Sequence, residues 1–253
     1  MQQITGRAIV IGGAGGIGSA VCRTLATQGH QVVVADFNEA RAREVLSTMD
    51  GRGHTLETLD VTDPDSVSST FERIEAQDPA RVLVVASGGP QVHLGQRADL
   101  VTLTRTTWDR TLALNLTGTF CCLQTFARQR LARPLAHARV ILLGSTAGAV
   151  AGSGVDIAYC AAKAALLGLA RQAAFELAPA GLTVNVVAPG PVGTPEFFSN
   201  TNTEIRKEIA SLTLLGRLAT PEEVSASVAY VASAQTDFVT GATLAINGGV
   251  HMA

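Results

Sequence analysis

The chain has 253 residues, of which 47% are apolar and 16% charged, with 25 glycines and a formal net charge of −2. This composition excludes a disordered chain, which would be polar and strongly charged, and the near-balanced charge argues against a nucleic-acid-binding protein. No apolar run approaches the roughly 20 residues of a membrane span, and residues 1–7 lack the layout of a signal peptide. We therefore expect a cytoplasmic protein with no membrane association.

Short β-rich runs alternate with helical patterns along the chain. Strands are predicted at 7–11, 31–35, 54–59, 82–86, 140–143, 183–188 and 243–246. Helices are predicted from the glycine loop to about 28, then at 39–49, from 63 to 76, and at 106–133, 157–177 and 221–234. Several strands are apolar throughout, as a sheet covered on both faces requires. The alternation predicts an α/β fold with a parallel sheet, in one domain over residues 1–253.

A glycine-rich loop lies between the first predicted strand and the first predicted helix. It contains Gly12, Gly15, Gly16, Ile17 and Gly18. Glycines there let the backbone approach a pyrophosphate closely, and the helix N-terminus supplies free N–H groups and a positive dipole end. The strand before it and the helix after it favour a dinucleotide site over a tight structural turn.

Asp36 ends the second predicted strand, 18 residues after Gly18. A carboxylate there can accept hydrogen bonds from the adenosine ribose hydroxyls, and it would repel a 2′-phosphate. Neither Gly15 nor Phe37 supplies a basic side chain to offset this repulsion. The sequence therefore favours NAD(H) over NADP(H), although an Asp at this position could also simply form a turn.

Tyr159 and Lys163 lie four residues apart in a predicted helix, so their side chains share one helical face. A cation beside the phenol favours the phenolate, so we expect Lys163 to lower the pKa of Tyr159 towards neutrality. Tyr159 could then act as a general acid or base on an alcohol or carbonyl oxygen. The alternative is a Tyr–Lys pair on a solvated face, which fits poorly in so apolar a stretch.

Two further polar residues are candidates for the same site. Ser145 follows the fifth predicted strand, where the carboxyl ends of parallel strands open onto the ligand crevice. Asn115 interrupts an apolar helical stretch and must find a hydrogen-bond partner there, such as a backbone group, a water or Lys163. The alternative for Asn115 is a position on the helix surface.

These segments, in this order, resemble the short-chain dehydrogenase/reductase family from Ile9 to Gly249. Besides the residues above, the resemblance rests on Asp60-Val61, on Asn185-x-x-x-Pro189-Gly190-Pro191-Val192-x-Thr194, on Gly216-Arg217-Leu218 followed by Pro221, and on Asn247-Gly248-Gly249. It implies a Rossmann fold with a seven-stranded, doubly wound parallel sheet between two layers of helices. It also implies a homo-oligomer, either a tetramer or a dimer, that acts on a small-molecule substrate.

The resemblance also implies roles for particular residues. Asn115, Ser145, Tyr159 and Lys163 would form the catalytic tetrad, in which Tyr159 exchanges the proton and Ser145 holds the substrate oxygen. Lys163 would bind the nicotinamide ribose, and Asn115 would help to position a relay water. The remaining cofactor contacts would be Phe37 beside Asp36, Asp60 and Val61 at the adenine, Ala86 and Gly88 after the fourth strand, and Pro189, Gly190, Val192 and Thr194 at the nicotinamide.

The chain departs from the family pattern in three places. Ile11 stands where the family usually has Thr, and Val85-Ala86 stands where it usually has Asn-Asn, so side-chain hydrogen bonds that brace the cofactor site are missing. The spacing from the catalytic serine to Tyr159 is one residue longer than usual. We prefer Ser145 because Gly148 follows it by the usual three residues, with Thr146 as the alternative.

The leading functional hypothesis is an NAD-dependent dehydrogenase or reductase for a secondary alcohol or ketone. We expect substrate choice to depend on residues 89–103 and on the segment after Thr194, which could form a lid. The first alternative is a non-catalytic NAD-binding sensor or scaffold, motivated by the departures at Ile11 and Val85-Ala86. The second is epimerisation, dehydration or dehalogenation on the same fold. We predict no metal site, because the five histidines are scattered and the four cysteines form no C-x-x-C pair.

Overall fold

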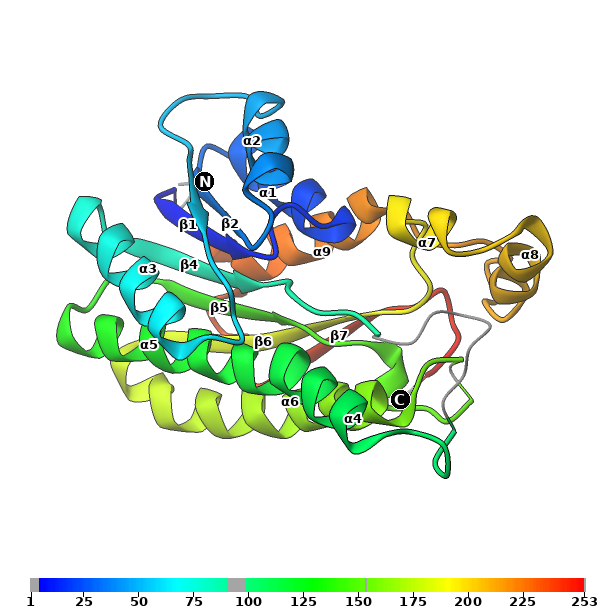
Figure 1. The fold of residues 1–253 in the computed structure, drawn as a ribbon. Helices are drawn as coiled ribbons and strands as arrows, with labels where there is room; N and C mark the ends of the chain where they lie inside the picture. Colours follow the sequence, from blue (N-terminus) through cyan, green and yellow to red (C-terminus); the bar gives the residue numbers. More distant parts are fainter. Residues whose placement is uncertain (1–4, 91–98, 153, 253) are drawn as a thin grey trace.

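The computed structural model describes residues 5–90, 99–152 and 154–252. Its centre is a seven-stranded sheet in the order β3-β2-β1-β4-β5-β6-β7, with helices on both faces (Figure 1). All neighbouring strands are parallel. This arrangement confirms the predicted doubly wound α/β fold.

The strands agree with the prediction to within two residues at each end. They are β1 (Arg7–Ile11), β2 (Gln31–Asp36), β3 (Thr55–Thr58), β4 (Ala80–Val85), β5 (Ala138–Leu143), β6 (Leu182–Pro189) and β7 (Thr243–Ile246). Five of them, β1, β2, β4, β5 and β6, are almost entirely buried. Burial on both faces explains why their sequences are apolar throughout rather than alternating.

The helices are α1 (Gly16–Thr27), α2 (Glu39–Ser47), α3 (Pro64–Gln77), α4 (Arg105–Leu112), α5 (Gly118–Ala132), α6 (Ile157–Leu177), α7 (Pro195–Ser199), α8 (Thr203–Ser211) and α9 (Pro221–Ala232). Two features differ from the prediction. The long helix expected at 106–133 is interrupted by a π-helical turn, Ala113–Thr117, between α4 and α5. The segment after Thr194 forms α7 and α8, which the prediction did not include and neither of which contains a buried residue.

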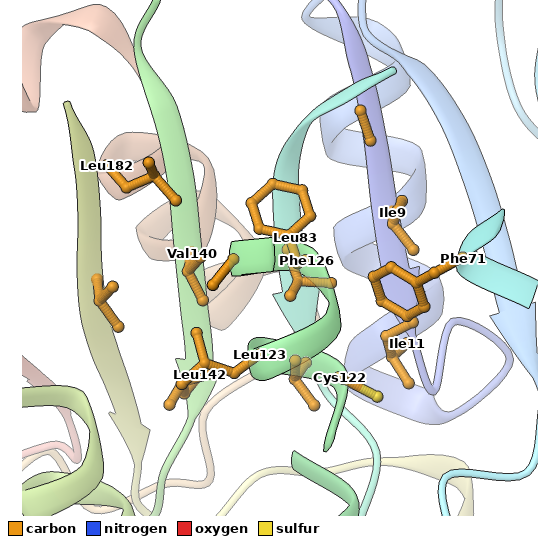
Figure 2. Close-up of a cluster of buried hydrophobic side chains, with 14 of the residues drawn as sticks. Ile9, Ile11, Phe71, Leu83, Cys122, Leu123, Phe126, Val140, Leu142 and Leu182 are labelled. Atoms are coloured by element: carbon orange, nitrogen blue, oxygen red, sulfur yellow. The ribbon is translucent and has the colours of Figure 1, made fainter. Parts of the chain in front are cut away.

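Successive residues of β1 feed two separate cores. Ala8 and Val10 point to the face covered by α1 and α9, and these two helices pack against each other. Ile9 and Ile11 point to the other face, which is covered by α3, α5 and α6. Figure 2 shows the second core, where Phe71 of α3 lies beside the side chains of β1. The sheet therefore lies between two apolar cores, each covered by helices.

The strand order reverses between β1 and β4, because the chain first builds outward through β2 and β3 and then returns beside β1. In open parallel sheets this reversal leaves a crevice at the carboxyl ends of the strands, where ligands bind. No helix in the described part of the chain is long and apolar enough to cross a membrane. Part of the segment expected to influence substrate choice, residues 91–98, lies outside the described residues.

Candidate active site

The glycine-rich loop is folded tightly between β1 and α1. Gly12 has a φ of 76°, which favours a residue without a Cβ, and its N–H donates to the Ala35 carbonyl at 2.8 Å. A Cβ on Gly18 would lie 2.0 Å from the Gly12 carbonyl oxygen, so only glycine allows α1 to begin this close to the loop. Gly15 is the N-cap of α1 and bears no side chain that could block the helix N-terminus.

The carboxylate of Asp36 is held by two backbone N–H groups. Its Oδ2 accepts a hydrogen bond from Ala14 in the glycine loop at 2.9 Å, and its Oδ1 accepts one from Asn38 at 2.9 Å. Asp36 therefore both shapes the turn after β2 and lines the adjoining cleft. The turn-forming and ligand-facing interpretations of this residue are compatible.

A cleft of about 880 Å³, including its open mouth, lies at the carboxyl ends of β1 to β4. It is lined by eight of the residues predicted to bind a cofactor, namely Gly12, Gly15, Asp36, Phe37, Asp60, Val61, Ala86 and Gly88. The prediction missed four lining residues, Ile11, Leu59, Ser87 and Leu114. The first three are sequence neighbours of predicted residues, whereas Leu114 carries no local signal and reaches the cleft through the π-helical turn.

The walls of this cleft fit a dinucleotide. The backbones of the glycine loop and of the segment after β4 are in direct contact, because a Cβ on Gly12 would lie 2.6 Å from the Ser87 nitrogen. The hydroxyl of Ser87 is buried and has no hydrogen-bond partner among the described residues. A buried hydroxyl is normally paired, and the phosphates and ribose hydroxyls of a dinucleotide are groups that would pair with it.

Asp60 and Val61 are held at the far side of the cleft by local contacts. The Oδ1 of Asp60 accepts hydrogen bonds from the backbone N–H and hydroxyl of Thr62 at 2.8 and 2.7 Å. Val61 packs against α5, where a Cβ on Gly118 would lie 2.8 Å from the Val61 carbonyl oxygen.

Asn115 is completely buried in the π-helical turn, a distortion that is frequent at functional sites. Its Oδ1 accepts a hydrogen bond from Gly89 N–H at 2.9 Å, and its Nδ2 donates to the Gly89 and Thr111 carbonyls at 3.1 and 3.0 Å. Asn115 therefore fixes the segment after β4 to the α4–α5 helix. Its partners are backbone groups, and the surface alternative is wrong.

Lys163 is buried on α6 beside the same segment. Its Nζ donates to the Leu143 carbonyl at the end of β5 at 2.8 Å and lies 5.6 Å from the centre of the Tyr159 ring. Burial lowers the pKa of the amine from 10.5 to about 8. A Cβ on Gly88 would lie 2.4 Å from Asn115 Oδ1 and 3.4 Å from Lys163 Nζ, so the backbone of Gly88 joins the two side chains to the cleft.

Tyr159 is half-buried in the first turn of α6, where its backbone N–H is capped by the carboxylate of Asp156 at 2.9 Å. Burial raises the pKa of the phenol to about 12, and a hydrogen bond with Ser145 opposes this rise. The expectation that Lys163 lowers this pKa towards neutrality is wrong for the protein chain by itself. Burial disfavours the charged form of both groups, and desolvation of the phenol outweighs the hydrogen bond with Ser145.

The structure separates the two candidate hydroxyls. Ser145 contacts Tyr159 and accepts a hydrogen bond from Ala147 N–H at 3.1 Å. The hydroxyl of Thr146 is buried and donates to the Pro189 carbonyl at 3.1 Å. Thr146 therefore ties β5 to β6, and Ser145 is the hydroxyl that reaches the phenol.

The residues predicted at the nicotinamide end begin with Pro189, the last residue of β6, and do not line the cleft defined above. A Cβ on Gly190 would lie 2.9 Å from the Cα of Asn247, and Val192 forms an isolated bridge with Ala219. Thr194 lies nearest to the glycine loop, because a Cβ on Gly16 would meet its Cβ at 2.6 Å. This segment therefore lies against the start of α1.

The chain is similar to known enzymes over almost its whole length. The family model described as enoyl-(acyl carrier protein) reductase matches residues 12–251. A cis-4-hydroxycyclohexanecarboxylate dehydrogenase from Sinomonas cyclohexanicum is 36% identical over 96% of this chain and 95% of the relative. A 3-oxoacyl-(acyl-carrier-protein) reductase from Escherichia coli is 33% identical over 97% of each chain.

Solved structures agree with these matches. The crystal structure of gox2181 superposes with a TM-score of 0.90 at 29% identity, covering 97% of this chain and 95% of the other. A 3-oxoacyl-(acyl-carrier protein) reductase from Brucella melitensis with bound NAD superposes with a TM-score of 0.87 at 28% identity, covering 100% and 93%. From its fold, its site and these similarities, the chain belongs to the short-chain dehydrogenase/reductase family of oxidoreductases.

Proposed function

We propose that the protein is an NAD(H)-dependent dehydrogenase that interconverts a secondary alcohol and the matching ketone. The observation that carries this proposal is the meeting of Ser145, Tyr159 and Lys163 beside a cleft whose other end carries Asp36. A hydroxyl, a phenol and an amine placed together can hold an alcohol oxygen and move its proton. A bound nicotinamide would accept or donate the hydride.

Each polar group at this site has its own role in the proposal. The Tyr159 hydroxyl exchanges the proton with the substrate oxygen, and the Ser145 hydroxyl orients that oxygen. Lys163 is fixed by the Leu143 carbonyl and binds the nicotinamide ribose. Asn115 keeps the backbone at Gly89 in place and helps to position a water that relays protons through Lys163.

The preference for NAD(H) rests on Asp36. Its carboxylate lies in the cleft and is fixed by two backbone hydrogen bonds, so it cannot turn away from a phosphate on the adenosine ribose. A structural neighbour holds NAD, which agrees with this preference. From the family resemblance, we further propose that residues 1–253 form one domain and that the protein works in the cytoplasm as a homo-oligomer, either a tetramer or a dimer.

The test follows the absorbance of reduced nicotinamide while the purified protein is mixed with NAD+ or NADP+ and a panel of secondary alcohols. We expect NAD+-dependent turnover that Tyr159→Phe abolishes without reducing NAD+ binding. NAD+ binding without turnover of any alcohol or ketone would favour the non-catalytic sensor instead. Tighter binding of NADP+ would show that the interpretation of Asp36 is wrong.

A matched pair of variants separates the two neighbouring hydroxyls. Ser145→Ala should lower kcat about 100-fold or more, the size of effect typical for a group that assists proton transfer. Thr146→Val should keep most of the turnover and lower the melting temperature, because the Pro189 carbonyl loses its buried donor. The reverse pattern would assign the catalytic hydroxyl to Thr146.

A further inference from the structure

An ion pair joins helix α7 to helix α2. The Nη2 of Arg41 donates to the Oε1 of Glu196 at 2.7 Å, although the two residues are 155 positions apart in the chain. Arg41 lies in the first turn of α2, directly after the β2 end that carries Asp36. Glu196 lies in the first turn of α7, which Thr194 caps.

The pair lies over the start of α1. A Cβ on Gly16 would meet the Cβ of Thr194 at 2.6 Å and the Oε2 of Glu196 at 3.1 Å. One oxygen of the Glu196 carboxylate therefore lies beside Gly16 at the start of α1, and the other accepts the hydrogen bond from Arg41 on α2. One residue thus connects the segment after β6 to the adenosine side of the cleft.

The charges on the adenosine side matter for the choice of cofactor. A basic side chain near the end of β2 can accommodate the 2′-phosphate of NADP(H), whereas a carboxylate such as Asp36 favours NAD(H). Helix α2 carries two arginines close to that point, and a carboxylate holds each of them. Arg41 pairs with Glu196, and Arg43 pairs with Glu39 of its own helix at 2.6 Å.

We propose that Glu196 is a specificity-determining residue, which holds Arg41 away from the 2′-position of the adenosine ribose and thereby reinforces the preference for NAD(H). Glu196 acts as a positioning residue, through Arg41 and not by contact with the reacting atoms. This inference rests on the proposed NAD(H) function and adds a second determinant to Asp36. It also gives the first turn of α7 a role in the choice of cofactor, separate from any role in binding the substrate.

Removal of the carboxylate frees the guanidinium. In Glu196→Gln, Arg41 can meet a 2′-phosphate while Asp36 remains in place. Both side chains are about half exposed, and contacts of that kind change an affinity by up to about fivefold. We therefore expect Glu196→Gln to tighten NADP+ binding by about twofold to fivefold and to change NAD+ binding less than twofold.

The experiment measures the dissociation constants of NAD+ and NADP+ by titration calorimetry, without substrate. The variants are Glu196→Gln, Arg41→Gln, the double variant, and Glu39→Gln as the matched control. Glu39→Gln removes the same charge and frees an arginine on the same helix, but its pair does not cross the glycine loop. We expect the gain for NADP+ in Glu196→Gln alone, with the double variant returning to the wild-type ratio.

Three results would overturn the inference. They are an unchanged cofactor ratio in Glu196→Gln, an equal gain in Glu39→Gln, and a gain that survives in the double variant. Circular dichroism before titration confirms that each variant is folded. Arg41→Gln, for which we expect the wild-type ratio, gives a second route to the same answer. Tighter NADP+ binding by the wild-type protein would instead contradict the proposed NAD(H) function itself.

Discussion

Replacement of Lys163 by Met tests how much the buried charge of the Lys163 amine destabilises the fold. The amine is buried and its pKa falls from 10.5 to about 8. Since each tenfold change in a protonation equilibrium corresponds to about 1.4 kcal/mol, this lowering means that the charged amine destabilises the fold by about 3 kcal/mol at neutral pH. Methionine has a similar length and carries no charge, so Lys163→Met removes this penalty.

The sign of the pH dependence follows from linkage. Below pH 8 the amine is charged in both the folded and the unfolded chain, and the penalty is fully present. Between pH 8 and 10.5 the unfolded chain binds more protons at this group than the folded chain, so stability rises with pH. From pH 7 to pH 9.5 the wild-type protein should regain about 2 kcal/mol relative to Lys163→Met. The hydrogen bond to Leu143 survives deprotonation of the donor, so its loss in the variant adds an offset that does not depend on pH.

The assay is urea unfolding followed by circular dichroism at pH 7 and pH 9.5, at equal protein concentrations. Lys207→Met is the control, because Lys207 is exposed on α8. We expect the free energy of unfolding of Lys207→Met to follow that of the wild-type protein at both pH values. A constant difference between wild type and Lys163→Met, or a loss of wild-type stability relative to this variant at high pH, would refute the reasoning.

Two further predictions concern the packing that supports the site. Gly88→Ala places a Cβ 2.4 Å from Asn115 Oδ1 at a φ of 124°, so it should lower the free energy of unfolding by about 2 kcal/mol. The control is Gly89→Ala, whose Cβ meets nothing within 4 Å, and equal urea midpoints for the two variants would contradict the prediction. Glu75→Ala removes the carboxylate that pairs with the fully buried Arg130 of α5, so it should destabilise the protein by about 3 kcal/mol. Glu75→Gln should destabilise it less, and an unchanged thermal midpoint in Glu75→Ala would show that Arg130 does not depend on this partner.

Local sequence was sufficient for the elements with strong periodicity or strong end signals. The strands β1 and β7 and the helix α6 have the predicted bounds. The apolar run of β1 admits few other structures, and Asp156 caps α6 through its side chain. The glycine loop was equally readable, since positive φ at Gly12 and the close approach at Gly18 require glycine. The family and most of the described cleft followed from these features.

Only the tertiary structure decided the features that depend on distant segments. The π-helical turn at Asn115 arises where the α4–α5 helix meets Gly89, and the ion pair between Arg41 and Glu196 joins segments 155 residues apart. No local pattern encodes such contacts. The tertiary structure also decided the directions in which the pKa values of Tyr159 and Lys163 shift. The sequence indicates which groups are neighbours on a helix, but the burial that opposes their charges is set by the packing of the whole fold.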